Sequence, residues 1–292
     1  MIIFRFIKKK IFRSKIYNYY LLKNDFKDVL FTPNDAWPGD PALGDQLVQG
    51  HYKLAGKKIY SPEKTLWNID NSDNYWVKEA HSFSWLRHLK SRSGHLARKH
   101  ARYLILEWLR FYENWDEKSW EIEILSRRIS AWVTNIDFLL AEKDLVFEKK
   151  FKKNLFKQVK HLELQIRRKY FLFFEKNYCS EISSLKKIKI LKGLFLSNIC
   201  IENKNIKLFK YLKMLEKELK ANFNFEGVHI SRSPSTQLAT LAELVTIREA
   251  MISKNEKVPE LLEIIIKKAS HSLRFFRTAN GTFVTFNGSK KE

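Results

Sequence analysis

The side chains best suited to chemistry gather in three short segments that mix imidazole, indole and guanidinium groups. The first segment, residues 76–90 (WVKEAHSFSWLRHLK), contains His81, Trp85 and His88. On one continuous helix these three share a face, because they follow the i, i+4, i+7 spacing. An indole stacks on the apolar side of a sugar ring and a histidine can exchange a proton, so this face suits a glycan. The alternative is that the aromatic residues are core and that His81 makes a helix–helix hydrogen bond.

The second segment, residues 126–138 (SRRISAWVTNIDF), combines arginine with tryptophan. Arg128 and Trp132 are four residues apart and can meet on one helix face. A guanidinium binds planar carboxylate or sulfate groups in a bidentate way, and an indole adds a stacking plane. A structural arginine stacked on a packing tryptophan fits this spacing equally well.

The third segment, residues 225–238 (FEGVHISRSPSTQL), is a loop that leads into a helix beginning near Pro234. Backbone N–H groups at such a helix start, with Arg232 beside them, can hold an anion. His229 is in reach as a proton carrier. The alternative is a capped turn in which Arg232 has a structural partner.

Metal binding and disulfide chemistry are not expected. His81 and His88 are seven residues apart and no third ligand follows at metal-binding spacing, so we expect neither a metal nor another cofactor. Cys179 and Cys200 do not form a CxxC pair and are expected to be reduced core residues.

The composition is that of a folded, strongly basic protein. In 292 residues, 54 Lys and Arg outnumber 32 Asp and Glu, giving a formal net charge of +22. Such a surface attracts polyanions, but abundant Lys, Ile, Asn and Phe also fit an AT-rich genome. The aromatic and arginine segments lie outside the Lys-rich stretch 148–160, so a polysaccharide is favoured as partner and no specific nucleic acid is expected.

Hydrophobic periodicity predicts a mainly helical chain after a mixed N-terminal part. Residues 1–60 read as a basic helical leader, a loop with a short helix from about Pro41, and a small hairpin over 51–60. The leader fits a membrane-surface element or, more often, a packing or strand-exchanging arm. Residues 61–277 form the helical domain, and residues 278–292 carry a β signal from Phe283 to Phe286. Helices are expected at 74–90, 94–112, 118–141, 145–177, 182–202, 204–222, 234–253 and 257–276.

The three segments, in this order, resemble the N-terminal half of heparinase II/III-like proteins, a polysaccharide lyase family. The likeness covers roughly residues 33–289 and rests on a series of short motifs. They are WPGDP from Trp37, the Glu79, His81, Phe83 and Trp85–Arg87 pattern, Arg127–Arg128 with Trp132, Gly227 and His229 followed by SRSPS and Gln237, LRFFR at 273–277, and the NG and FNGS turns.

This resemblance implies an incomplete (α/α) toroid of helical hairpins followed by β-sandwich layers, with the polysaccharide in the cleft between them. It implies cleavage of uronic acid polysaccharides by β-elimination, in which a carboxylate is neutralised, a Tyr or His removes the C5 proton and a donor protonates the leaving oxygen. No metal is needed for that transfer. The sequence itself suggests a cytoplasmic location, because the leader lacks a signal-peptide pattern and no segment is long and apolar enough to cross a membrane. The resemblance implies the periplasm as the alternative location.

The roles implied by the resemblance are assigned residue by residue. Proton transfer is expected from His81, His229 or Tyr103, and substrate binding from Trp85, Arg128, Trp132, Asn198, Arg232 and Gln237. The chain has no Asn-His dipeptide of the kind such lyases use to neutralise the carboxylate, and Asn198 is the substitute.

The sequence also carries only the first β signal of the second domain. The chain is therefore expected to be a truncated lyase half, inactive or incomplete alone, and a separately encoded β-sandwich domain is an expected partner. The alternatives are a non-catalytic glycan-binding or scaffold protein and, less favoured, a basic nucleic-acid-binding helical protein.

Overall fold

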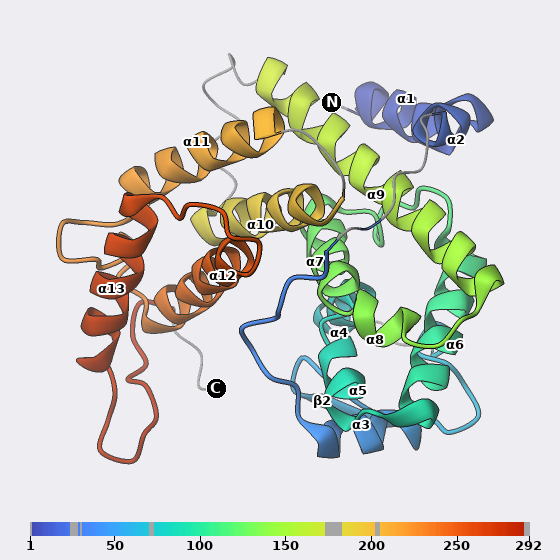
Figure 1. Cartoon of the computed structure of the whole chain (residues 1–292), viewed down its shortest axis with the longest axis horizontal. Helices are drawn as coiled ribbons and strands as arrows, with labels where there is room; N and C mark the ends of the chain where they lie inside the picture. Colours follow the sequence, from blue (N-terminus) through green and yellow to red (C-terminus); the bar gives the residue numbers. More distant parts are fainter. Residues whose placement is uncertain are drawn as a thin grey trace. The chain divides into compact units, whose positions relative to one another are not determined.

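The computed structural model of the chain describes residues 2–23, 29, 31–69, 73–172, 183–201 and 205–288 (Figure 1). It divides into two compact units, Met1–Asp28 with Pro38–Phe171 and Val29–Trp37 with Leu172–Glu292. The described residues form thirteen helices and one two-stranded sheet, so the predicted mainly α fold is confirmed. The domain limits at residues 60 and 277 stay a prediction.

The first unit contains the small sheet and nine of these helices. Its elements are α1 (Ile2–Arg13), α2 (Lys15–Leu22), α3 (Pro41–Val48), β1 (His51–Leu54), β2 (Lys57–Tyr60), α4 (Asn74–Ser82), α5 (Leu86–Arg92), α6 (Gly94–Tyr112), α7 (Ile122–Thr134), α8 (Ile136–Leu140) and α9 (Leu145–Leu172). The strands pair antiparallel around a turn at Ala55 and Gly56, whose φ values are both positive, and Tyr52 and Leu54 of β1 are buried. The predicted helix start at Pro41 and the predicted hairpin are confirmed.

The helix predicted over residues 74–90 is two helices, because the chain turns at Phe83. This residue has a left-handed conformation (φ 58°, ψ 17°), which costs a non-glycine residue roughly 1–2 kcal/mol. Its ring is fully buried and lies 5.0 Å from the Trp85 ring and 5.4 Å from the Trp132 ring, so aromatic packing offsets the cost. The shared face predicted for His81, Trp85 and His88 is therefore wrong, since no continuous helix joins them.

The helix predicted over residues 118–141 also differs from the structure. It begins at Ile122, where the Glu121 carboxylate accepts two backbone N–H groups as the N-cap, and it is interrupted at Asn135. The Asp116 carboxylate accepts the backbone N–H groups of Lys118 and Ser119 in the preceding turn.

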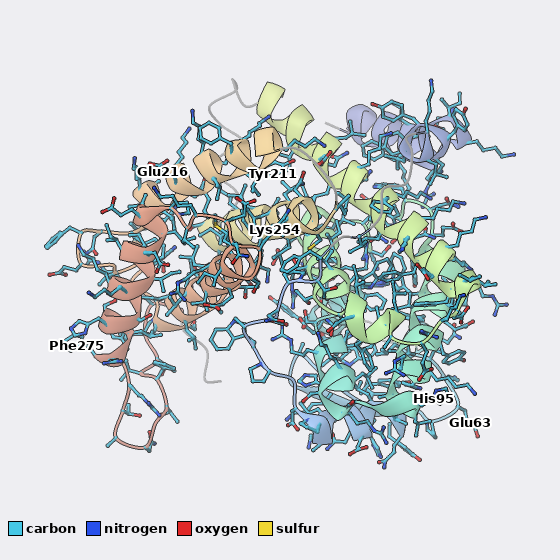
Figure 2. All side chains as sticks on the ribbon, viewed as in Figure 1. Glu63, His95, Tyr211, Glu216, Lys254 and Phe275 are labelled. Atoms are coloured by element: carbon cyan, nitrogen blue, oxygen red, sulfur yellow. The ribbon has the colours of Figure 1, made fainter. Side chains whose placement is uncertain are left out.

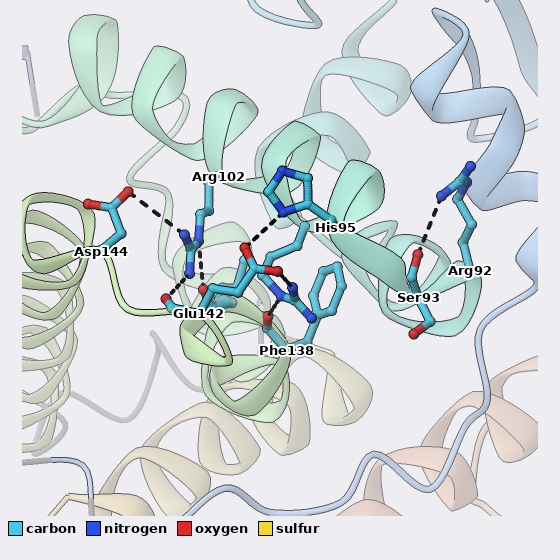
Figure 3. A network of polar contacts seen from close by, with 9 residues as sticks. Arg92, Ser93, His95, Arg102, Phe138, Glu142 and Asp144 are labelled. Carbon is cyan, nitrogen blue, oxygen red and sulfur yellow. Dashed lines mark hydrogen bonds and ion pairs between the residues drawn. The ribbon is translucent and has the colours of Figure 1, made fainter.

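Two arginines of α6 fasten that helix to the end of α8 (Figure 3). The Arg98 Nε group donates to the Phe138 carbonyl at 2.9 Å, and the Arg102 Nε group donates to the Leu139 carbonyl at 2.8 Å. Arg98 also pairs with the Glu142 carboxylate, which contacts His95 Nδ1 at 2.9 Å. The last carbonyls of a helix lack intrahelical partners, so these guanidinium groups satisfy the end of α8 and fix its place against α6.

The second unit is built from α10 (Ser184–Cys200), α11 (Asn205–Asn222), α12 (Pro234–Ser253) and α13 (Glu260–Arg274). Helix α10 contacts α11 and α12, and α12 contacts α13. The Lys254 Nζ group at the end of α12 donates to the Ile199 carbonyl of α10 at 2.8 Å (Figure 2). The predicted helix start near Pro234 is confirmed, with Ser233 as its N-cap, and Cys200 is a buried free thiol as expected. Cys179 lies outside the described residues.

The C-terminal β signal produces a short turn in the part that the structure describes. Arg277 and Phe283 form one antiparallel bridge around the turn at Gly281, and residues 284–288 contain no strand. None of the described helices is both long and apolar enough to cross a bilayer.

Candidate functional site

His81, in the last turn of α4, is buried and neutral. The Trp108 Nε1–H group donates to its Nδ1 at 3.0 Å. An indole nitrogen only donates, so Nδ1 is unprotonated and the ring proton is on Nε2. Burial, with the charge of Arg128 added, lowers the pKa of His81 to about 3. At neutral pH this histidine can therefore donate a hydrogen bond from Nε2, and it has no free nitrogen lone pair with which to accept a proton.

Arg128 of α7 holds His81 from inside the unit. The guanidinium is fully buried, and its Nη1 donates to the carbonyls of His81 at 3.0 Å and Ser119 at 2.8 Å, while Nε donates to Gln158 Oε1 at 2.6 Å. Its centre lies 4.2 Å from the Trp108 ring centroid. Burial lowers the pKa of Arg128 to about 9. These contacts make Arg128 a positioning residue for His81, with no face open to solvent.

Two aromatic rings that the sequence segments did not include lie against His81. The Trp67 ring stacks on the imidazole with a centroid distance of 5.5 Å, and the Tyr112 ring contacts it edge-on at 4.7 Å. Both residues are half-buried. Burial, followed by the charge of Asp116, raises the pKa of Tyr112, so its hydroxyl stays protonated at neutral pH. We call His81, Trp67, Tyr112 and Asp116 the His81 cluster.

Asp116 gives the His81 cluster a negative charge. Burial raises the pKa of this carboxyl, but hydrogen bonds from Ser119 N–H at 2.9 Å, Ser119 Oγ at 3.0 Å and Lys118 N–H at 3.1 Å outweigh burial and lower it overall. The exposed Lys118 follows in the same turn, and its charge also acts on His81. The cluster thus combines a stacking ring, two neutral hydrogen-bond donors and one negative charge, with the positive charge of Lys118 beside it.

Trp85 and Trp132, selected for ring stacking, form the core behind the His81 cluster. Trp85 is 2% exposed and its Nε1 donates to the Ala80 carbonyl at 3.0 Å. Trp132 is fully buried and packs edge-on against Trp108 at 5.8 Å. Their assignment to a glycan site stays a prediction. The indole next to His81 that is only half-buried is that of Trp67.

Tyr103 is on α6, as Tyr112 is, but on the opposite side of the helix. The two are nine residues apart, which at 100° per residue is about half a turn. Tyr103 is half exposed, and its ring lies 6.4 Å from that of His100. The structure therefore does not bring Tyr103 to His81.

His229 of the second unit is also neutral and fully engaged. The Ser231 backbone N–H donates to its Nδ1 at 3.1 Å, so the ring proton is on Nε2, which lies 3.1 Å from Ser184 Oγ. Burial lowers the pKa of His229. A serine nucleophile needs an unprotonated nitrogen beside it, so Ser184 and His229 are not arranged as a nucleophile and its base.

Gln237 joins the loop of His229 to two helices. Its Oε1 accepts the His229 N–H at 3.2 Å, and its Nε2 donates to the Ala269 carbonyl at 3.1 Å and to Ser272 Oγ at 2.6 Å. The side chain is 1% exposed, so its described contacts are structural. Its predicted role in substrate binding stays a prediction.

Arg232 and Asn198 lie near the surface of the same unit. Arg232 is exposed with φ 53°, and its N–H donates to the His229 carbonyl at 2.8 Å, which ties its turn to the loop of His229. Asn198 is half-buried on α10, where its Nδ2 donates to the Leu194 carbonyl at 2.8 Å. Within the described ranges no group of three His, Cys, Asp or Glu side chains is placed to hold a metal ion.

The fold is that of heparinase lyases. A heparinase III crystal structure matches 95% of this chain with a TM-score of 0.66 and 14% identity, and 46% of that chain is covered. Heparan sulfate lyase HepC from Pedobacter heparinus matches 94% of this chain with a TM-score of 0.61 and 13% identity over 45% of its own length. The predicted resemblance and the helical toroid fold are therefore confirmed as a likeness of fold: the chain has the helical fold that heparinase III shows over 46% of its length.

A curated protein is similar to this chain in sequence. FtsZ-localized protein C of Caulobacter vibrioides is 27% identical over 265 residues, which cover 88% of this chain and 42% of that protein. The chain thus spans less than half the length of the relative and of the lyases that it matches. No protein-family model matches the sequence.

The contacts of Arg128 predict a large effect on stability. Replacing Arg128 with Met leaves the His81 and Ser119 carbonyls and the Gln158 amide oxygen without their donor, and we expect a loss of roughly 3–5 kcal/mol in the free energy of unfolding. Arg127→Met is the matched control, because Arg127 is half-buried and pairs with Glu79 near the surface; we expect about 1 kcal/mol there. Denaturant unfolding measures both, and equal losses would contradict the assignment.

The buried neutral state of His81 predicts acid sensitivity. Between its ordinary pKa of 6.5 and its folded pKa of about 3, the unfolded state binds more protons than the folded state, so stability falls as the pH falls through this window. The slope from this residue is at most about 1.4 kcal/mol per pH unit. His81→Gln should reduce the slope. Nitrogen NMR of the His81 ring should show the Nε2–H form, and titration near pH 6.5 would refute it.

Proposed function

We propose that this chain is the substrate-binding helical domain of a heparinase II/III-like lyase and binds acidic, uronic acid-containing polysaccharide. The observation that carries the proposal is the heparinase III fold over 95% of the chain, whose first unit contains the His81 cluster, with His81 buried and Trp67, Tyr112 and Asp116 half-buried around it. The identity between the two chains is low, so the choice of ligand rests on the chemistry of the cluster.

The His81 cluster offers the three contacts that sugar recognition uses. Trp67 supplies a ring for the apolar side of a pyranose, and the His81 Nε2–H and Tyr112 hydroxyl groups are neutral donors for sugar oxygens. The exposed Lys118 can meet a uronic carboxylate or a sulfate, while the charged Asp116 keeps that anion away from the imidazole. In this proposal the positively charged chain also draws the polyanion toward the site.

Binding is supported better than cleavage by this chain alone. β-Elimination needs a base to remove the C5 proton, and His81 and His229 each have the acceptor nitrogen engaged by an N–H donor. Tyr103 lies on the other side of α6 from the cluster, and in this proposal it is not the base. In this proposal proton transfer therefore falls to groups other than these three side chains.

Glycan binding can be tested on the cluster directly. The chain should bind heparin and alginate more tightly than a neutral glucan in calorimetry, without releasing unsaturated uronic acid products. Trp67→Ala should weaken binding about tenfold or more, which corresponds to about 1.4 kcal/mol of lost stacking. Tyr75→Ala, an exposed aromatic residue on α4, is the control and should bind as the unaltered chain does. Equal affinity for the neutral glucan, or no binding to any of the three, would refute the proposal.

A second candidate function is a non-catalytic scaffold at FtsZ. It is supported by the 27% identity with FtsZ-localized protein C, which extends over 88% of this chain. Purified chain should then sediment with FtsZ polymers and remain in solution with unassembled FtsZ. A chain that stays in the supernatant in both cases would contradict this candidate, while glycan binding by the His81 cluster would be unaffected.

A further inference from the structure

The first 23 residues carry charge of one sign only. They contain seven Lys and Arg residues and no Asp or Glu. Helices α1 and α2 span residues 2–13 and 15–22 of this stretch. Among the side chains that the structure describes, Lys10, Arg13, Lys15 and Lys23 are exposed. The two helices therefore present concentrated positive charge that no acidic residue of their own balances.

One side of these helices is attached to the first unit. Phe12 is 3% exposed and its ring lies 5.4 Å from Trp115 and 5.1 Å from His161. The Tyr17 hydroxyl is hydrogen-bonded to His161 Nδ1 at 2.7 Å, and Leu21, one helical turn further along α2, is buried. These contacts fix which side of α2 faces the protein.

A second side of α2 is apolar and exposed, with its edge at Tyr20, whose ring centroid lies 4.5 Å from Lys160 Nζ of α9. Ile16, Tyr19 and Tyr20 follow the i, i+3, i+4 spacing and are 82%, 68% and 48% exposed. Helix α1 adds exposed Phe6 and Ile11. We call these five residues the outer face of α1 and α2. Large apolar side chains gathered in this way usually mark an interaction surface.

We propose that the outer face of α1 and α2 lies on the surface of a membrane that contains anionic lipids. A helix that combines an apolar, aromatic side with basic residues and no acidic ones inserts its apolar side among acyl chains, while the cations meet lipid phosphates. Tyrosine suits this depth because its ring is apolar and its hydroxyl is polar. Both helices are far too short to span a bilayer, so the contact is with the surface.

Charge argues against a second copy of the chain as the occupant. Two outer faces packed together would bring seven cations of each copy near those of the other, with no carboxylate from this stretch to neutralise them. The phosphates of a nucleic acid would pair with the cations. They would leave Ile16, the most exposed of the five residues of the outer face, without an apolar partner. An anionic lipid surface supplies both phosphate and hydrocarbon.

Vesicle sedimentation tests the proposal with the full chain. We expect binding to vesicles of phosphatidylcholine with phosphatidylglycerol, weaker binding at high salt, and little binding to phosphatidylcholine alone. Replacing Ile16, Tyr19 and Tyr20 together with Ser should weaken binding about tenfold or more, as should Lys10→Glu, Arg13→Glu and Lys15→Glu together.

The matched control is Phe225→Ser with Ile230→Ser, which removes two exposed apolar side chains from the second unit and should bind normally. Circular dichroism and the unfolding midpoint show whether each variant is folded. Failure of the unaltered chain to bind phosphatidylglycerol vesicles, equal binding to phosphatidylcholine vesicles, or normal binding by both sets of folded variants would overturn the proposal. The glycan site is separate, since none of the residues replaced belongs to the His81 cluster.

Discussion

The buried guanidinium of Arg128 is the interaction on which the first unit depends. It reaches the end of α4 through the His81 carbonyl, the turn before α7 through the Ser119 carbonyl, and α9 through Gln158. A cation that is buried away from water is stable only where hydrogen-bond acceptors face its N–H groups. Nε and Nη1 of Arg128 have such acceptors, whereas Nη2 has no hydrogen-bond partner among the described residues. The side chain that the sequence assigned to a substrate anion therefore joins three elements and determines where the His81 cluster lies.

The same arrangement fixes the chemistry of His81. With Trp108 donating to one ring nitrogen and burial excluding the charged form, the imidazole is a neutral donor that stacks on Trp67 and contacts Tyr112 edge-on. Neutral donors beside aromatic rings favour recognition of sugar hydroxyls over proton abstraction. The chemistry of the cluster thus fits the proposed binding of a glycan, and it distinguishes that property from catalysis.

The second unit uses polar residues in a comparable way. His229 accepts from Ser231 N–H, and Gln237 connects the His229 loop with α12 and α13. Buried polar side chains stabilise a fold only when their partners are present, so such clusters appear in a sequence as candidate sites even where they connect helices. The helix cap at Ser233 and the buried Gln237 both belong to this connection.

The sequence alone determined the features that depend on neighbouring residues: the helical periods of α6 and α12, the Ser233–Pro234 start, the Ala55–Gly56 hairpin and the fold class. These follow from local backbone preferences and side-chain spacing. The tertiary structure decided the rest. Phe83 adopts a left-handed conformation because its ring packs on Trp132, and Trp67 and Tyr112 meet His81 only because the chain folds back. No local pattern encodes such contacts, since their energy comes from residues distant in the sequence.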